Sequence, residues 1–137
     1  IPDYPAANEG VISVAATNSD NKKATFSNYG PTIDVVAPGS NILSTFVKFE
    51  NDQVIYDYEL KSGTSMAAPN VSGIASVLRS FYPKYSASKI KEIILESGIQ
   101  MYSSLKIPSS DNIETPNFFS KTGKLVNLYN ALLYASK

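Results

Sequence analysis

The chain has 137 residues, of which 43% are hydrophobic and 18% charged, and its formal net charge at pH 7 is zero. This is the size of one compact domain or of part of a larger one, with enough apolar material to fill a core. The basic residues are scattered, which excludes a concentrated cationic surface for nucleic acid or anionic membranes. No apolar run approaches the roughly 20 residues that span a bilayer.

The chain contains neither cysteine nor histidine. Without cysteine there is no disulfide, thiolate metal site or cysteine nucleophile. Without histidine there is no imidazole that could act as a base near pH 7 or bind a metal ion. The chain begins with IPDYP, without an initiating Met or an apolar leader, and this start predicts a cleaved or partial piece of a longer protein.

The first half of the chain is predicted to form strands. Residues 11–16 and 33–37 are nearly continuous apolar runs, typical of strands covered on both faces in a parallel sheet. Turn residues at 18–21 and the PG pair at 38–39 end these runs. Residues 42–49 and 53–60 are rich in β-branched and aromatic residues and flank the polar residues 50–52, which predicts a hairpin.

The second half is predicted to be mainly helical. Apolar residues between Ser65 and Phe81 cover most of a helical wheel, so this helix is expected to be buried almost all round. The YP pair at 82–83 ends it, and a second helix is expected between a cap at Ser86 and Gly98. Residues 99–122 predict a surface loop. Residues 125–135 predict a last helix, whose inward side chains are Leu128, Leu132 and Ala135.

The segment GTSMAAP at residues 63–69 carries the candidate nucleophile, Ser65. A serine in the first turn of a helix lies beside unpaired N–H groups and the positive end of the helix dipole, which favour developing negative charge. The backbone N–H of Ser65 can therefore stabilise an oxyanion. Gly63 lets a substrate backbone approach closely, and we assign Gly63 and Thr64 to substrate binding. The competing interpretation is that Thr64 or Ser65 merely caps the helix.

Residues 63–73, GTSMAAPNVSG, closely resemble the nucleophile signature of the subtilisin-like serine endopeptidases. Further blocks resemble the family in the same order and spacing: YP at 4–5, VISV at 11–14, ATFSNYG at 24–30, DVVAPG at 34–39, YP at 82–83 and GKLVN at 123–127. The resemblance covers nearly the whole chain. It implies that residues 1–137 are the C-terminal part of a single subtilisin-like peptidase domain, an α/β three-layer fold with a mainly parallel sheet.

The same resemblance implies a mechanism that this chain cannot complete. The family uses an Asp-His-Ser triad in that order along the chain, so Ser65 inherits the nucleophile role while His, Asp and an oxyanion Asn would lie upstream. We therefore expect a polypeptide substrate, an acyl-enzyme on Ser65, the upstream half of the domain as partner, and no activity from the chain alone. The alternatives are an inactive pseudoprotease that binds peptides or partners, and one half of a nicked enzyme held noncovalently.

The resemblance also assigns roles to four further positions. Asp3 falls near the wall or base of the S1 pocket, where a carboxylate would favour Lys or Arg at P1. The alternative is that Asp3 is a solvated loop carboxylate without a role in substrate binding. Asp34 matches a position near a weak cation site in some relatives, so a structural calcium ion is the alternative there to the expectation of no metal and no cofactor. Asn70 stands where the family usually has a structural His. The bond before Pro5 is expected to be cis.

The end of the chain implies a location. Residues 127–133 are most similar to exported proteases of Bacteroidetes-type bacteria. We therefore expect a secreted or envelope-associated bacterial protein.

Overall fold

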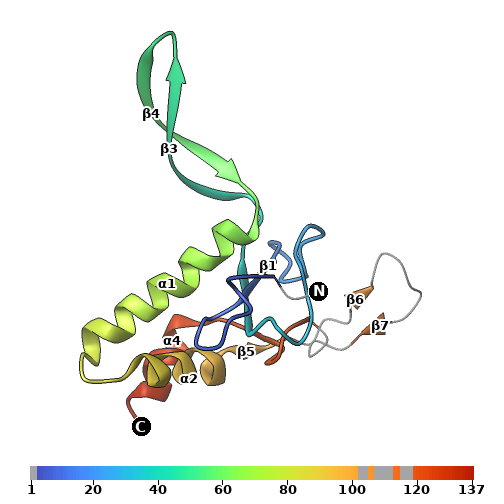
Figure 1. Ribbon diagram of the computed structural model, residues 1–137, viewed down its shortest axis with the longest axis vertical. Helices are drawn as coiled ribbons and strands as arrows, with labels where there is room; N and C mark the ends of the chain where they lie inside the picture. Colours follow the sequence, from blue (N-terminus) through green and yellow to red (C-terminus); the bar gives the residue numbers. More distant parts are fainter. Residues whose placement is uncertain (1–2, 102–104, 107–112, 115–118) are drawn as a thin grey trace.

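The computed structural model describes residues 3–101, 105–106, 113–114 and 119–137. At its centre is a four-stranded sheet with the strand order β1-β2-β8-β5 (Figure 1). These strands are β1 (Val14–Thr17), β2 (Val35–Pro38), β8 (Lys124–Leu125) and β5 (Ile99–Gln100). β1, β2 and β8 run parallel, and β5 pairs with β8 in the antiparallel direction. The expected α/β class with a mainly parallel sheet is confirmed.

Both faces of the sheet are covered, as the apolar runs predicted. In β2, Val35 and Ala37 join the core cluster beneath the helices, whereas Val36 joins a second cluster on the other face with Met101 and Phe119. This division follows from the alternation of side chains along a strand. β1 begins later than predicted because Val11 lies in a turn, with its N–H bonded to the carbonyl of Asn8.

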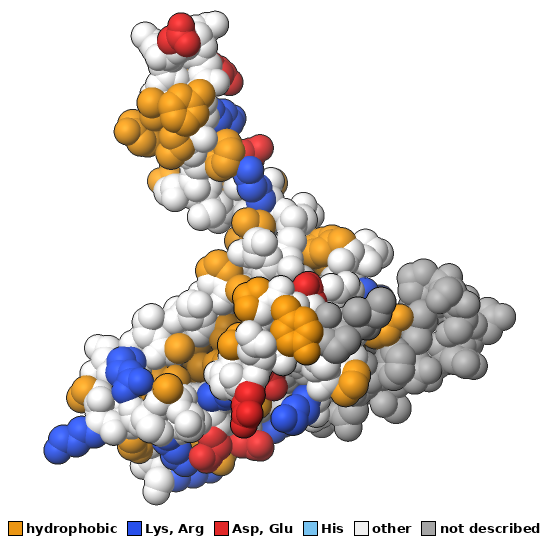
Figure 2. Space-filling model, in the orientation of Figure 1, with side chains coloured by type: hydrophobic (Ala, Val, Ile, Leu, Met, Phe, Trp, Pro, Cys, Tyr) orange, Lys and Arg blue, Asp and Glu red, His pale blue; other side chains and the backbone are white. Residues whose placement is uncertain are grey.

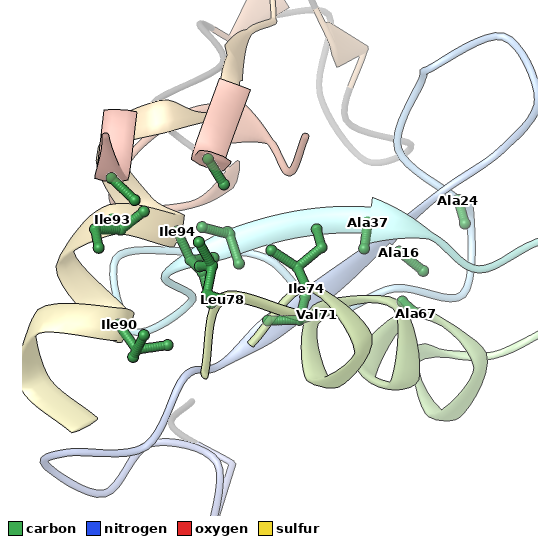
Figure 3. Close-up of a cluster of buried hydrophobic side chains, with 13 residues drawn as sticks. Ala16, Ala24, Ala37, Ala67, Val71, Ile74, Leu78, Ile90, Ile93 and Ile94 are labelled. Carbon is green, nitrogen blue, oxygen red and sulfur yellow. The ribbon is translucent and has the colours of Figure 1, made fainter. Parts of the chain in front are cut away.

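Helix α1 (Thr64–Phe81) packs on β1 and β2 and ends before Tyr82 as predicted (Figure 3). Its buried side chains form one stripe: Ala67, Val71, Ile74 and Leu78. The prediction that this helix is buried almost all round was wrong for the described chain, since Phe81 is 70% exposed. The outward face carries small residues that are also exposed: Ala68, Ser72, Gly73 and Ser76.

Helices α2 (Ala87–Ser97) and α4 (Leu128–Ala135) pack against each other and against α1. The predicted caps of α2 are confirmed, because Ser86 accepts the N–H of Lys89 at 3.1 Å and Gly98 is the C-cap. α4 begins later than predicted, because residues 124–125 pair with neighbouring strands. Leu128 is 38% exposed, so it does not face inward as expected. The buried residues of α4 are Ala131 and Ala135.

The described part of residues 99–122 is not the surface loop that the sequence predicts. Met101, Phe119 and Ser120 are buried, and residues 99–100 form β5. Two further short strands, β6 (Leu105–Lys106) and β7 (Ile113–Glu114), pair in the antiparallel direction. Residues 102–104, 107–112 and 115–118 of the predicted loop lie outside the described residues.

The predicted hairpin is confirmed as β3 (Ile42–Glu50) and β4 (Gln53–Lys61), which project from the body of the molecule (Figure 1). Asn51 and Asp52 form the connection with positive φ angles of 51° and 60°. Two consecutive positive φ values are typical of the tight turns that match strand twist. Among the helices of the described residues, none combines the length and apolar character needed to cross a bilayer.

Candidate active site

Ser65 lies in the first turn of α1 with an exposed side chain. The N-cap is Gly63, in an extended conformation, and no side chain makes a capping hydrogen bond. The interpretation of Thr64 or Ser65 as the helix cap was therefore wrong. The carbonyl of Gly63 accepts the N–H groups of Met66 at 3.0 Å and Ala67 at 3.3 Å. Ser65 is the second residue of the helix, and an N–H at that position has no intrahelical carbonyl to bond.

Gly39, which the sequence indicated as the end of a strand and as part of a block resembling the family, holds the segment before Ser65 in place. Its carbonyl accepts the N–H of Gly63 at 2.8 Å, and its own N–H donates to the carbonyl of Thr17 at 3.0 Å. A Cβ on Gly39 would lie 2.7 Å from the Cβ of Ala16 and 2.8 Å from the oxygen of Gly63. The available sequence signal was a glycine just after a buried strand, the end at which α/β sheets place their sites.

Asn70 ties the start of α1 to the end of β2. Its Nδ2 donates to the carbonyl of Pro38 at 3.0 Å and to that of Met66 at 3.1 Å. The residue is exposed, so its amide satisfies backbone carbonyls at the surface of the described chain. The side chain that replaces the family's usual His therefore serves a positional role here.

Asp3 and Thr64 line the same small cavity, of about 80 Å³, although they are far apart in the sequence. Among the described residues that line it, Asp3 is the acidic one. The Tyr4–Pro5 bond next to it is cis, which confirms that prediction. A Cβ on Gly63 would meet only ordinary contacts, at 3.7 and 3.8 Å, so the protein's own packing does not require a glycine there. The cavity can therefore offer a negative charge close to the nucleophile segment.

Asp34 is held by groups of the protein itself. Its Oδ2 accepts the N–H of Ser13 at 3.1 Å and the ammonium of Lys91 at 3.0 Å, and that ammonium also donates to the carbonyl of Val11 at 2.6 Å. A carboxylate and a backbone carbonyl are ligands that Ca²⁺ takes, but here they converge on a lysine. The described residues contain no group of three or more acidic, His or Cys side chains that could hold a metal ion. Asp34 and the Val11 carbonyl are therefore already bound by the ammonium of Lys91.

With this geometry in view, comparison with known proteins identifies the family. The model of the subtilase family, peptidase S8, matches residues 2–123. The chain belongs to the subtilase family. The matched range includes Asp3, Gly63, Thr64 and Ser65, and the mixed α/β fold described above is the fold of its structural neighbours.

Two subtilase relatives and one solved structure show how much of such a protein this chain represents. It is 36% identical over 133 residues to thermitase of Thermoactinomyces vulgaris, covering 97% of this chain and 40% of thermitase. It is 47% identical over 75 residues to an extracellular basic protease of Dichelobacter nodosus, covering 55% of this chain and 12% of that protein. A solved protease from Pseudoalteromonas arctica PAMC 21717 superimposes with a TM-score of 0.74 at 26% identity, covering 96% of this chain and 38% of the other. The chain spans less than half the length of each of these proteins.

Proposed function

We propose that the chain supplies the nucleophile of a serine endopeptidase. In this mechanism the Oγ of Ser65 attacks a peptide carbonyl while its proton passes to a histidine, an acyl-enzyme forms as the amine leaves, and water then hydrolyses the ester. The observation that supports this role most directly is the exposed Ser65 in the first turn of α1, behind a backbone anchored to the sheet through Gly39. Such anchoring keeps a nucleophile in one position without reorganisation.

The surroundings of Ser65 favour the developing oxyanion. Ser65 lies in the first turn of α1, so its N–H and the positive end of the helix dipole would both favour negative charge on the oxygen of a carbonyl attacked by this serine. A second donor is needed to complete such a site, and we assign it to an asparagine outside this chain. The proposed chemistry needs no cofactor.

The base must come from outside these 137 residues, because the sequence contains no histidine. We assign His, Asp and the oxyanion Asn to an upstream half of the same peptidase domain, of which residues 1–137 would form the C-terminal part. The 40% coverage of thermitase is consistent with this division. The chain alone is then expected to be inactive, since in a subtilisin the loss of the base costs about as much activity as the loss of the whole triad.

We assign Asp3 to the S1 pocket and infer a preference for Lys or Arg at P1. The support is the cavity that Asp3 shares with Thr64, next to the proposed nucleophile.

We also propose that the protein is exported from a bacterial cell, to the envelope or beyond. That location is supported by the extracellular basic protease among the relatives. The finer likeness to Bacteroidetes-type proteases stays a prediction.

A fluorophosphonate probe, which labels activated serines, tests this function. The isolated chain is compared with a chimera that joins it to the part of thermitase outside the matched region. Only the chimera should be labelled. Ser65→Ala should abolish the label, whereas Ser72→Ala, an exposed serine on the same helix, should retain it.

Two results would contradict the proposal in different ways. Labelling of the isolated chain would show that no external histidine is needed. A folded but unlabelled chimera, checked by circular dichroism and by peptide binding, would favour the pseudoprotease alternative.

A further inference from the structure

The projecting hairpin has one continuous apolar face. In the register of β3 and β4, Leu43 is opposite Leu60, Thr45 opposite Tyr58, Val47 opposite Tyr56, and Phe49 opposite Val54. Residues directly opposite each other lie on the same side of a sheet, and alternate residues along a strand share that side. All eight side chains therefore lie together, and we call them the apolar face: Leu43, Thr45, Val47, Phe49, Val54, Tyr56, Tyr58 and Leu60.

The other side of the hairpin, the polar side, carries every charged residue of β3 and β4, four of them in two ion pairs, together with the apolar Ile42, Phe46 and Ile55. Lys48 forms a salt bridge with Asp57 at 3.2 Å, and Lys61 forms one with Glu59 at 3.7 Å. The Nζ of Lys61 also lies 3.8 Å from the centre of the Phe46 ring. These contacts are typical of a surface that faces water. The hairpin is thus amphipathic. Exposure to water suits the charged residues of the polar side but not the apolar face.

The apolar face is exposed along its whole length. The exposed fraction of its seven large apolar side chains ranges from 45% for Val47 to 82% for Tyr56. An aromatic side chain has about 150–250 Å² of surface, and an aliphatic one somewhat less. Multiplied by the exposed fractions, these areas sum to roughly 800 Å² of exposed surface on the apolar face. A typical monomer has no apolar patch larger than about 300–600 Å². Figure 2 shows apolar side chains gathered on the hairpin, well away from the body of the molecule.

We propose that this face binds the same face of a second copy of the chain. The exposed area is close to the roughly 800 Å² that each partner contributes to a standard interface. The face has no charged residue, so two copies meet without repulsion and without a need for a partner of opposite charge. The hairpin also projects away from the body of the molecule, so its apolar face is accessible to another chain (Figure 1).

The pairing can be specified further from two-fold symmetry. If the two hairpins point in opposite directions, the axis passes between the Thr45–Tyr58 and Val47–Tyr56 pairs. Tyr56 then faces Tyr58 of the other copy, and Leu43 faces Phe49 of the other copy. A hollow of about 380 Å³ is lined at this level of the hairpin by Thr45, Val47, Tyr56 and Tyr58 of the apolar face, and also by Phe46 and Asp57 of the polar side. Tyrosines at the centre of an interface are frequent hot spots.

Sedimentation velocity over a concentration series tests this proposal with a matched pair of variants. Val54→Lys places a charge on the apolar face, whereas Gln53→Lys places it on the adjacent residue of the polar side. The chain should form a dimer, and Val54→Lys should weaken it about 30-fold or more, the scale of a hot spot. Gln53→Lys should change the dissociation constant by less than about 3-fold, within the effect of a rim charge. Circular dichroism checks that both variants keep the fold.

Salt provides a second measurement that does not depend on any variant. Raising ionic strength from about 0.1 M to about 1 M should not weaken a dimer held by an uncharged face, because screening acts only on charges. Three results would overturn the proposal: a dimer that both lysine variants weaken equally, polydisperse aggregates, or a monomer at every concentration. The last result would assign the face to the polypeptide that supplies the histidine.

Discussion

The ammonium of Lys91 donates to the carboxylate of Asp34 at 3.0 Å, across 57 positions of the sequence. This ion pair joins α2 to the residue before β2, and the same ammonium reaches the carbonyl of Val11. Lys91 and Asp34 expose only 25% and 10% of their side chains. The negative charge of Asp34, which could have attracted a metal cation, is therefore already neutralised by the side chain of Lys91.

Replacing Lys91 should destabilise the fold measurably. Lys91→Met leaves the largely buried Asp34 carboxylate unpaired, and we expect a loss of about 2–3 kcal/mol in urea unfolding, somewhat below the cost at a fully buried pair. The matched control is Lys89→Met on the same helix, whose solvent-exposed pair with Glu92 should contribute far less to stability. A chelator should leave the unfolding midpoint of the wild type unchanged. Equal effects of the two variants would contradict the structural role of Lys91.

Gly39→Ala should disturb both stability and the nucleophile segment. The added Cβ would lie within 3 Å of Ala16 and of the Gly63 carbonyl, and relief of this overlap should cost about 1–3 kcal/mol. Gly73→Ala is the control, because a Cβ there meets nothing within 4 Å and a helix favours alanine by roughly 0.5–1 kcal/mol. Urea unfolding should show a lower free energy of unfolding for Gly39→Ala and a higher one for Gly73→Ala. Fluorophosphonate labelling of the chimera reports any displacement of Ser65. The prediction fails if both glycines respond alike.

Asp3→Asn should lower selectivity for basic residues at P1. Removing the carboxylate from the cavity should reduce kcat/KM for Lys and Arg substrates about 10-fold relative to Leu, since specificity here depends on charge complementarity. A library of peptides that differ at P1, assayed with the active chimera, measures this ratio. Asp20→Asn, at an exposed turn, is the control and should leave the ratio unchanged. A wild type without preference for basic P1 residues would refute the pocket role.

The carboxyl group of Asp57 should titrate below its usual range. The backbone N–H of Tyr58, and then the ammonium of Lys48, lower the pKa of Asp57. A lowered pKa means that the carboxylate stabilises the folded hairpin above the unfolded pKa, and that this contribution is lost as pH falls through the folded pKa. NMR titration should show that Lys48→Ala raises the pKa of Asp57 but leaves it below the ordinary value. Full recovery would mean that the lysine is the main cause.

Features set by neighbouring residues could be predicted from the sequence, and features set by distant contacts could not. The Ser86 cap and the turn at Asn51 depend on residues within a few positions, and both were predicted correctly. The two-residue strand β8 exists only because β2 and β5 lie on either side of it. The expected all-round burial of α1 followed from its apolar content, yet burial requires neighbours, and the described residues cover only one face. For the candidate site, the motif indicated Ser65, whereas the anchoring role of Gly39 depends on hydrogen bonds to Thr17 and Gly63 that the sequence does not reveal.

The hydrogen bond between Gly63 and Gly39 has a consequence for how this family can vary. It closes the base of the β3–β4 hairpin. The chain leaves the body of the molecule at Gly39 and returns at Gly63, where the carbonyl oxygen of the first and the nitrogen of the second are 2.8 Å apart. We expect that the segment between these glycines can be lengthened, shortened or exchanged without moving the start of α1 and, with it, Ser65. This segment is therefore a natural insertion point, where a new module could be grafted beside a nucleophile that stays in register.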